Sequence, residues 1–184
     1  ARVGPGGDFV VVVARRATVR EYETVCEEAD MHPGLVDLAT LSVVNLYLAG
    51  PAEPAGDALL VHMRPEATSI VIMRGGALIF YRNRAEGDED ALADVVHQTT
   101  MYYQDRLSGE GFSRVLLGGA GRTIGAAAAA RQGLEERLAA PVEPIDPASV
   151  VAFGNGVRAT PELSAALAPL MGILLRTRRE MVGV

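Results

Sequence analysis

Three features are scarce in this sequence: cysteine, blocks of basic residues and long apolar runs. The single cysteine, Cys26, excludes an internal disulfide framework and a zinc site with several thiolates. Because Cys26 falls in a helical pattern, we expect a reduced core residue rather than a reactive thiol. The longest apolar run, residues 165–175, is too short to cross a bilayer, which needs ~20 residues.

The charge balance also excludes one large class of partner. The 17 Lys+Arg residues and 23 Asp+Glu residues give a formal net charge of -6, and no segment concentrates the basic residues. Nucleic acid is therefore not expected as the main ligand. With 184 residues, 49% of them hydrophobic, the chain is long enough for one sizeable core or two small lobes. It opens at Ala1 without a signal-peptide pattern, so we expect an intracellular piece of a longer protein.

The first third of the chain predicts a strand and two helices. Residues 9–14 form a continuous β-branched run, typical of a strand buried on both faces. A capping box at 18–21 predicts the start of a helix that Pro33 and Gly34 break. Residues 35–37 look like a short strand, and Asp37 is placed to cap a helix over 38–48.

The remainder of the chain has the clearest β pattern. Short turns separate apolar runs at 58–63, 68–73 and 77–82, which predicts an antiparallel meander. The other predicted elements are a helix at 91–107, a strand at 114–117, an alanine-rich helix ending at Leu138, a short strand at 151–153 and a helix at 161–179. Together they predict an α/β protein with mixed strand directions and helices on both faces.

Few side chains suggest chemistry. His32, His62 and His97 lack the spacing of metal ligands, so no metal site is expected. No serine lies in a nucleophile elbow, which argues against a serine hydrolase. The acidic residues within 86–90 are expected to form a solvated loop and a first helical turn. We therefore predict no catalytic residue.

The glycine-rich run 118–121 is more informative. It lies between a predicted strand and a predicted helix, where small residues let the backbone approach a ligand and a helix N-terminus favours an anion. It lacks both the Lys-Ser/Thr pair of a P-loop and the spacing of a dinucleotide fingerprint. A tight turn without a ligand explains it equally well.

The order of these segments resembles the PilM family, the actin-like proteins of type IV pilus assembly, which belong to the FtsA-related superfamily. The segments that carry the resemblance are 10–16, 33–41, 59–72, the helix end at 101–103, 115–119 and 172–176. The likeness covers residues 9–176 and depends on their order and spacing, since no single motif is diagnostic.

The resemblance implies an actin-like (ribonuclease H-like) mixed sheet, as a partial copy of a two-lobed fold. The implied divisions are a loose N-terminus at 1–8, the end of an inserted subdomain with a returning first-lobe helix at 9–50, a linker at 51–57, the second-lobe core at 58–160 and a C-terminal helix at 161–184. A second small subdomain that the family usually inserts after residue 82 is absent here.

The resemblance also implies a degenerate phosphate-binding hairpin. The family pattern is Asp-x-Gly followed after three residues by Thr, but this chain has His62, Arg64 and Thr68 at those positions. A neutral imidazole is a poor ligand for Mg²⁺, and the Arg64 side chain and Pro65 hinder approach of a phosphate to backbone amides. The resulting tentative nucleotide-binding set is His62, Arg64, Thr68, Gly118, Gly119 and Gly121, with no metal ligand and no required cofactor. Bound ATP and magnesium remain an alternative.

The function that the resemblance implies is a non-catalytic adaptor or scaffold of a bacterial type IV pilus or related secretion system. Its implied partners are the PilN-like tail of an inner-membrane protein and the pilus motors, which places it in the cytoplasm, peripheral to the inner membrane and not inserted into it. The alternatives are an active ATPase or kinase-like enzyme, and a module whose likeness to the family is accidental. Leucine-rich stripes on the helices at 38–48 and 161–179 suggest a homodimer.

Overall fold

The computed structural model describes residues 2–3, 8–9, 11–50, 55–85, 89–119, 125–152, 154 and 160–182. The chain divides into two compact units, Ala1–Leu38 and Ala39–Val184. Within the described residues, no helix combines the length and the apolar character that crossing a bilayer requires.

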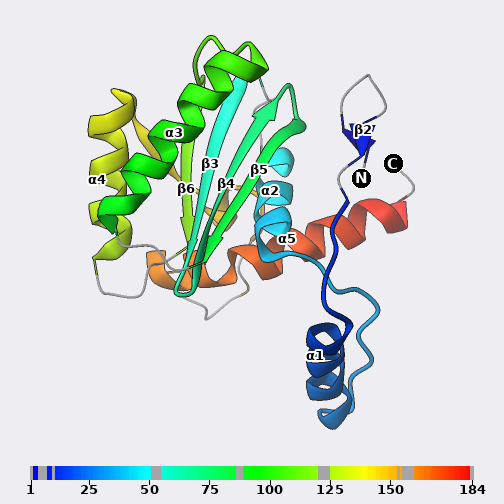
Figure 1. Ribbon diagram of the computed structural model, residues 1–184. Coiled ribbons are helices and arrows are strands. Elements are labelled where there is room, and N and C mark those ends of the chain that lie inside the picture. Colours follow the sequence, from blue (N-terminus) through cyan, green and yellow to red (C-terminus); the bar gives the residue numbers. More distant parts are fainter. Residues whose placement is uncertain are drawn as a thin grey trace. The chain divides into compact units, whose positions relative to one another are not determined.

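A five-stranded mixed sheet forms the centre of the larger unit (Figure 1). The strands are β3 (Asp57–Arg64), β4 (Ala67–Arg74), β5 (Ala77–Ala85), β6 (Arg114–Gly119) and β7 (Val142–Pro144). β3, β4 and β5 are an antiparallel meander, whereas β6 runs parallel to β3 and β7 parallel to β6. The resulting order is β5-β4-β3-β6-β7, and the predicted meander is confirmed.

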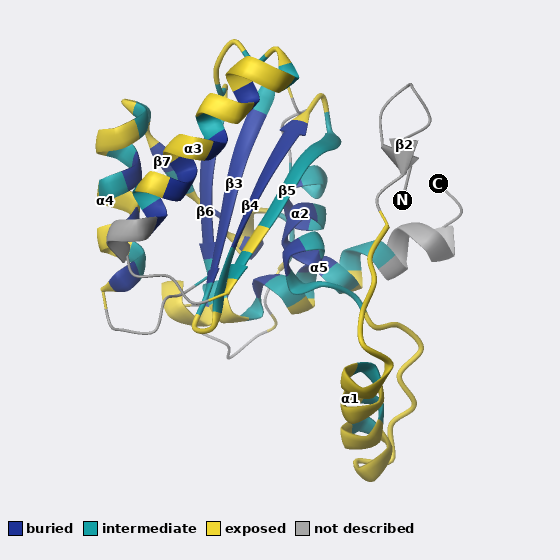
Figure 2. Cartoon of the chain, viewed as in Figure 1, coloured by how far each residue is buried: buried dark blue, intermediate teal, exposed yellow. Residues whose placement is uncertain are grey.

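Two pairs of helices cover the two faces of this sheet. The helices α3 (Glu89–Leu107) and α4 (Ala126–Leu138) pack on one face, and α2 (Ala39–Ala49) and α5 (Pro161–Val182) pack on the other. Leu59 and Val61 of β3 belong to the first core, whereas Ala58 and Leu60 belong to the second. Because both faces are covered, β3 is apolar along nearly its whole length, and the inner strands are buried (Figure 2).

The second core depends on a close approach between two helices. A side chain at Gly172 of α5 would overlap the backbone carbonyl of Ser42 in α2, so only glycine permits this contact. Val43 and Val44 of α2 are buried by it. The apolar stripe of α2 is therefore covered inside the chain. The α5 stripe is not, since Leu163, Leu170 and Leu174 are 36%, 58% and 62% exposed. The homodimer stays a prediction.

The predicted helices at 38–48, 91–107 and 161–179 and the alanine-rich helix are confirmed, with ends that shift by a few residues. The predicted strand at 151–153 is wrong, because residues 151–152 form no strand and residue 153 lies outside the described part. The strand that completes the sheet is β7, which the sequence analysis missed. Its three residues are too few for a periodic pattern, and they include Pro144, which an edge strand tolerates.

The smaller unit contains a two-residue ladder between β1 (Arg2–Val3) and β2 (Asp8–Phe9), followed by α1 (Arg16–Glu28). The predicted buried strand at 9–14 is wrong, because residues 11–15 have no regular structure and Val13 is 90% exposed. The strand-like step at 35–37 is also not a strand. A β-branched run becomes a strand only when a neighbouring strand supplies hydrogen bonds. Among the described residues of this unit, no strand lies beside residues 11–15.

Helix α1 corrects two further predictions. It begins at Arg16, with Arg15 as an N-cap that makes no side-chain bond, so the capping box at 18–21 lies inside the helix and does not start it. It ends at Glu28, before the proline, where Asp30 adopts a positive φ of 57°. No residue of α1 is buried, so Cys26 is a free, partly exposed thiol and not a core residue.

Candidate functional site

Most of the residues that the sequence analysis selected lie together at the carboxyl ends of β3 and β6. These strands are parallel and paired, with His62 opposite Gly118 and Met63 opposite Gly119. The carboxyl ends of neighbouring parallel strands are a common place for a ligand in α/β proteins. Gly121 and the acidic residues 86–88 lie outside the described residues.

His62 is buried near the carboxyl end of β3, with 1% of its surface exposed. Its Nδ1 lies 3.0 Å from Thr40 Oγ1, and that hydroxyl donates to Ser69 Oγ at 2.9 Å. Since the Thr40 proton is already used, Nδ1 of His62 carries the proton that the Thr40 oxygen accepts. Burial, and to a lesser degree the charge of Arg64, lowers the pKa of His62 from 6.5 to about 4. The imidazole is therefore neutral at physiological pH.

The hydrogen-bond chain continues from Ser69 to β5. Asn83 Nδ2 donates to Ser69 Oγ at 3.0 Å, and the Tyr81 hydroxyl lies 3.4 Å from the same oxygen. His62 thus belongs to a satisfied polar network that ties α2 to three strands. The sequence analysis missed Thr40 and Ser69, which are 22 and 29 residues from their partners. Counting back from the hairpin turn would have placed Ser69 opposite His62.

The other two residues of the hairpin do not join His62 in one cluster. Thr68 pairs with Met63, whose side chain is in the α3–α4 core, so Thr68 faces away from His62. Arg64 shares the face of His62, and its Nε is a buried nitrogen without a hydrogen-bond partner in the described part of the chain. The hairpin therefore presents a cation and a neutral imidazole where Mg²⁺ would need carboxylate oxygens.

One of the two glycines on β6 is required by a close backbone contact. Gly119 has a φ of +82°, and a side chain there would overlap the carbonyl oxygen of Met63 and lie 3.0 Å from Cδ2 of His62. A side chain at Gly118 would lie 2.9 Å from Cδ1 of Ile145. Packing therefore requires glycine at position 119, whereas at position 118 the end of the Ile145 side chain can move aside. The two glycines also leave room for a ligand beside the strand ends.

A cavity of about 440 Å³ opens beside these glycines, between β6, α4, β7 and the start of α5. That size suits a small molecule. Its wall is mostly apolar and small, including Ala127 and Ile145, and its polar groups include Arg131 and Ser164. The Nε of Arg131 is engaged at 3.0 Å by Glu135 of the same helix. No cluster of three His, Cys, Asp or Glu side chains suited to a metal occurs among the described residues. The lining also includes one carboxylate, that of Asp146.

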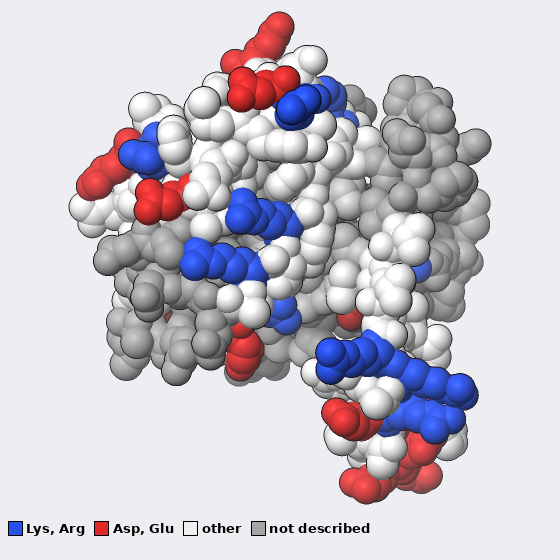
Figure 3. Space-filling view, viewed as in Figure 1, with Lys and Arg blue, Asp and Glu red and all other residues white. Residues whose placement is uncertain are grey.

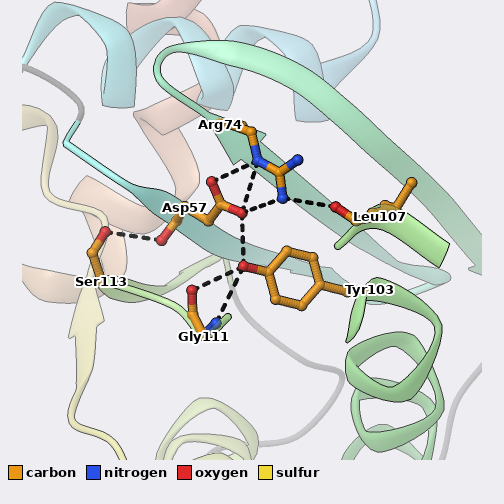
Figure 4. Close-up of polar contacts among 6 residues, drawn as sticks. All are labelled: Asp57, Arg74, Tyr103, Leu107, Gly111 and Ser113. Carbon is orange, nitrogen blue, oxygen red and sulfur yellow. Dashed lines mark hydrogen bonds and ion pairs between the residues drawn. The ribbon is translucent and has the colours of Figure 1, made fainter. Parts of the chain in front are cut away.

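A second polar cluster lies at the opposite end of β3 (Figure 4). The carboxylate of Asp57 accepts three bonds from Arg74, at 2.7–3.0 Å, and lies 2.7 Å from the hydroxyl of Tyr103. The same hydroxyl is 2.9 Å from the Gly111 carbonyl. Bonds from Arg74 hold the pKa of Asp57 below its usual value, and burial raises the pKa of Tyr103. Because these groups satisfy one another, the cluster is a structural brace.

Comparison with known proteins identifies the fold. No family model and no curated protein matches the chain. Among solved structures, a PilM–PilN type IV pilus biogenesis complex matches 89% of this chain and 58% of its own, at 17% identity and a TM-score of 0.73. The chain has part of an actin-like fold. The ethanolamine utilization protein EutJ from Carboxydothermus hydrogenoformans matches 94% of this chain and 63% of its own, at 11% identity and a TM-score of 0.54.

This actin-like chain therefore spans less than two thirds of the length of either structure. At such low identity the likeness shows the fold, as the sequence analysis predicted. The divisions drawn at 8, 50, 57 and 160 stay predictions, as do the individual roles of the six residues in the tentative nucleotide-binding set.

Proposed function

We propose that this chain belongs to a pilus-related actin-like protein that docks partner proteins without hydrolysing ATP. The fold similarity to a PilM–PilN complex supports a partner with a PilN-like tail. The observation that carries the non-catalytic part is His62, which is buried, neutral and bonded to Thr40. A neutral imidazole engaged in this way supplies neither the oxygen ligands for Mg²⁺ nor a base near neutral pH.

The test has two arms. Titration of the chain with Mg-ATP, followed by calorimetry and by the thermal unfolding midpoint, is expected to give no heat of specific binding and no shift. A ligand present at 100 times its Kd would stabilise the native state by about 2.7 kcal/mol, which is a readily measured shift. A midpoint raised by several degrees at submillimolar Mg-ATP contradicts the proposal.

The partner arm uses a synthetic peptide with the sequence of a PilN-like cytoplasmic tail, labelled with a fluorophore. Saturable binding that a scrambled peptide does not reproduce supports the docking function. Absence of binding to a longer form of the protein that contains the segments matching the rest of PilM overturns it, because that form presents every surface of the fold.

One observation favours a second candidate, an ATP-binding enzyme of the same fold. The cavity beside Gly118 and Gly119 has a suitable size for a small ligand. This candidate requires a carboxylate from outside the described residues to replace what His62 lacks. Measuring phosphate release in the same Mg-ATP samples distinguishes the two candidates. A rate of ATP hydrolysis above that of a sample without protein favours the enzyme.

A further inference from the structure

The sheet of the larger unit ends, on the meander side, at β5, which in the described ranges pairs with β4 alone. β5 is nine residues long and lies in register with β4 over almost its whole length. Among the described residues, no strand pairs with its outer side (Figure 1). On that side, no backbone hydrogen bond to another strand occurs within the described part of the chain, so alternate N–H and C=O groups point outward. Such an edge is a template for an added strand.

The side chains of β5 give this edge a definite charge. Arg82 and Arg84 lie opposite Ile70 and Thr68 of β4, on the face that α3 covers. β5 contains no acidic residue. The chain has no lysine, so the blue side chains that Figure 3 shows over the β4–β5 part of the sheet are arginines. This cationic edge stands out in a chain of net charge -6.

An aromatic pair adjoins the two arginines on the same face. Phe80 precedes Arg82 by two residues and lies 5.5 Å from Tyr102 of α3, measured between ring centroids. Tyr102 is 47% exposed although it sits against the sheet edge. Aromatic side chains of this kind are enriched at protein interfaces, where they supply large contact area at low entropic cost.

We propose that the outer side of β5 is a docking site for an extended acidic segment of a partner protein, which adds as a sixth strand. Its carboxylates, at alternate positions, would lie opposite and diagonal to Arg82, and an apolar side chain two positions away would contact Phe80 and Tyr102. A second copy of β5 does not satisfy this pattern, because it lacks carboxylates and would place arginines near arginines. The inference does not depend on the proposed pilus function.

The test uses a fluorescein-labelled eight-residue peptide of valine and threonine, with glutamate at two alternate positions and leucine two positions further on. We expect saturable binding to the 184-residue chain by fluorescence anisotropy, with slower hydrogen exchange of β5 amides on binding. Arg82→Glu is expected to weaken binding at least tenfold, whereas a peptide with lysines replacing the glutamates binds Arg82→Glu more tightly than the unsubstituted chain.

Matched controls separate strand addition from general charge attraction. Arg137→Glu on α4 makes the same change in net charge away from β5, and is expected to leave the affinity within twofold. A peptide with its two glutamates adjacent, or with N-methyl groups on the pairing amides, is expected to lose binding. The proposal is overturned if these peptides bind equally, if Arg82→Glu binds as before, or if β5 amides are not protected. Should Arg82→Glu lower the unfolding midpoint, Arg82→Gln and Tyr102→Ala replace it, each with an expected loss of at least threefold.

Discussion

At the scale of single residues, the environment of His62 decides what the hairpin at the end of β3 can do. Its ring lies between a hydroxyl from α2 and the backbone of Gly119, and within the described residues no carboxylate raises its pKa. Burial therefore acts on the imidazole without compensation and lowers its pKa. The same residue in an exposed turn would titrate near neutral pH. Here it stays neutral and holds two elements together.

This environment predicts a pH dependence of stability. The folded-state pKa of His62 is about 4, compared with 6.5 for the free group, so between these values the unfolded chain binds a proton that the folded chain does not. The free energy of unfolding should fall by about 2 kcal/mol between pH 7.5 and 5 through this residue alone. Urea unfolding at both pH values, for the chain and for His62→Gln, measures it. An equal slope in the two proteins would refute the assignment.

Gly119 supports a second residue-scale prediction. Gly119→Ala combines a positive φ with an overlap on the Met63 carbonyl, so we expect a loss of about 3 kcal/mol or more. Gly125→Ala is the matched control, because Gly125 has a similar φ of +91° and no described residue places an atom within 4 Å of an added side chain. The control should cost about 1 kcal/mol. Denaturant midpoints compare them, and equal losses would mean that backbone strain alone determines the effect.

At the scale of elements, the brace around Asp57 connects the β3–β4 hairpin to α3 and to the loop before β6. Arg74 belongs to β4, Tyr103 to α3, and Gly111 to the loop before β6, and all three are bonded to Asp57 or to one another. Tyr103 is 1% exposed and stacks on Phe112 with ring centroids 4.5 Å apart. The brace therefore fixes where α3 ends and where β6 begins.

Removing its charge should cost more than removing a surface ion pair. The side chain of Asp57 is 11% exposed, whereas the side chains of Arg114 and Glu143, which link β6 to β7, are 38% and 46% exposed. We expect Asp57→Asn to lower the free energy of unfolding by about 2 kcal/mol. Glu143→Gln should lower it by less than about 1 kcal/mol. Chemical denaturation at neutral pH distinguishes them, and the reverse order would show that the brace is not structural.

The elements that sequence patterns predicted well are those whose neighbours are close in sequence. β3, β4 and β5 pair through turns of two residues, so their period and turn chemistry suffice. The run at 11–13 consists of valines, which have high β propensity, yet it is not a strand. A strand needs a neighbour to pair with, and none lies beside this run in the described part of the smaller unit. β7 is the opposite case. Its three residues are too few to predict a strand, but β6 lies beside them and pairs with them.

At the scale of the whole molecule, the two units differ in how they are stabilised. Both hydrophobic cores lie within residues 43–168, whereas α1 has no buried residue. Burial of apolar side chains is the main favourable term in folding, so the larger unit contains what it needs to fold alone. The smaller unit exposes Val11, Tyr22 and Val25 by 64–78%.

A deletion tests this division. A chain of residues 39–184 is expected to unfold in one cooperative thermal transition, with a midpoint within a few degrees of that of the full chain. Circular dichroism and the dispersion of amide resonances measure it. A chain of residues 1–38 is expected to show neither a cooperative transition nor dispersed resonances. Loss of cooperativity in the longer piece would mean that the smaller unit is needed for folding.

The sequence by itself determined the α/β class, the meander and the principal helices, because these follow from residue types and short-range periodicity. Only the tertiary structure decided that His62 is neutral, that Thr68 faces away from it, and that β5 is left at an edge. The burial of a side chain, the face it lies on and the pairing of a strand depend on elements that are distant in the sequence. Thr40 of α2, for example, contacts His62 from 22 residues away, and no local sequence pattern predicts that contact.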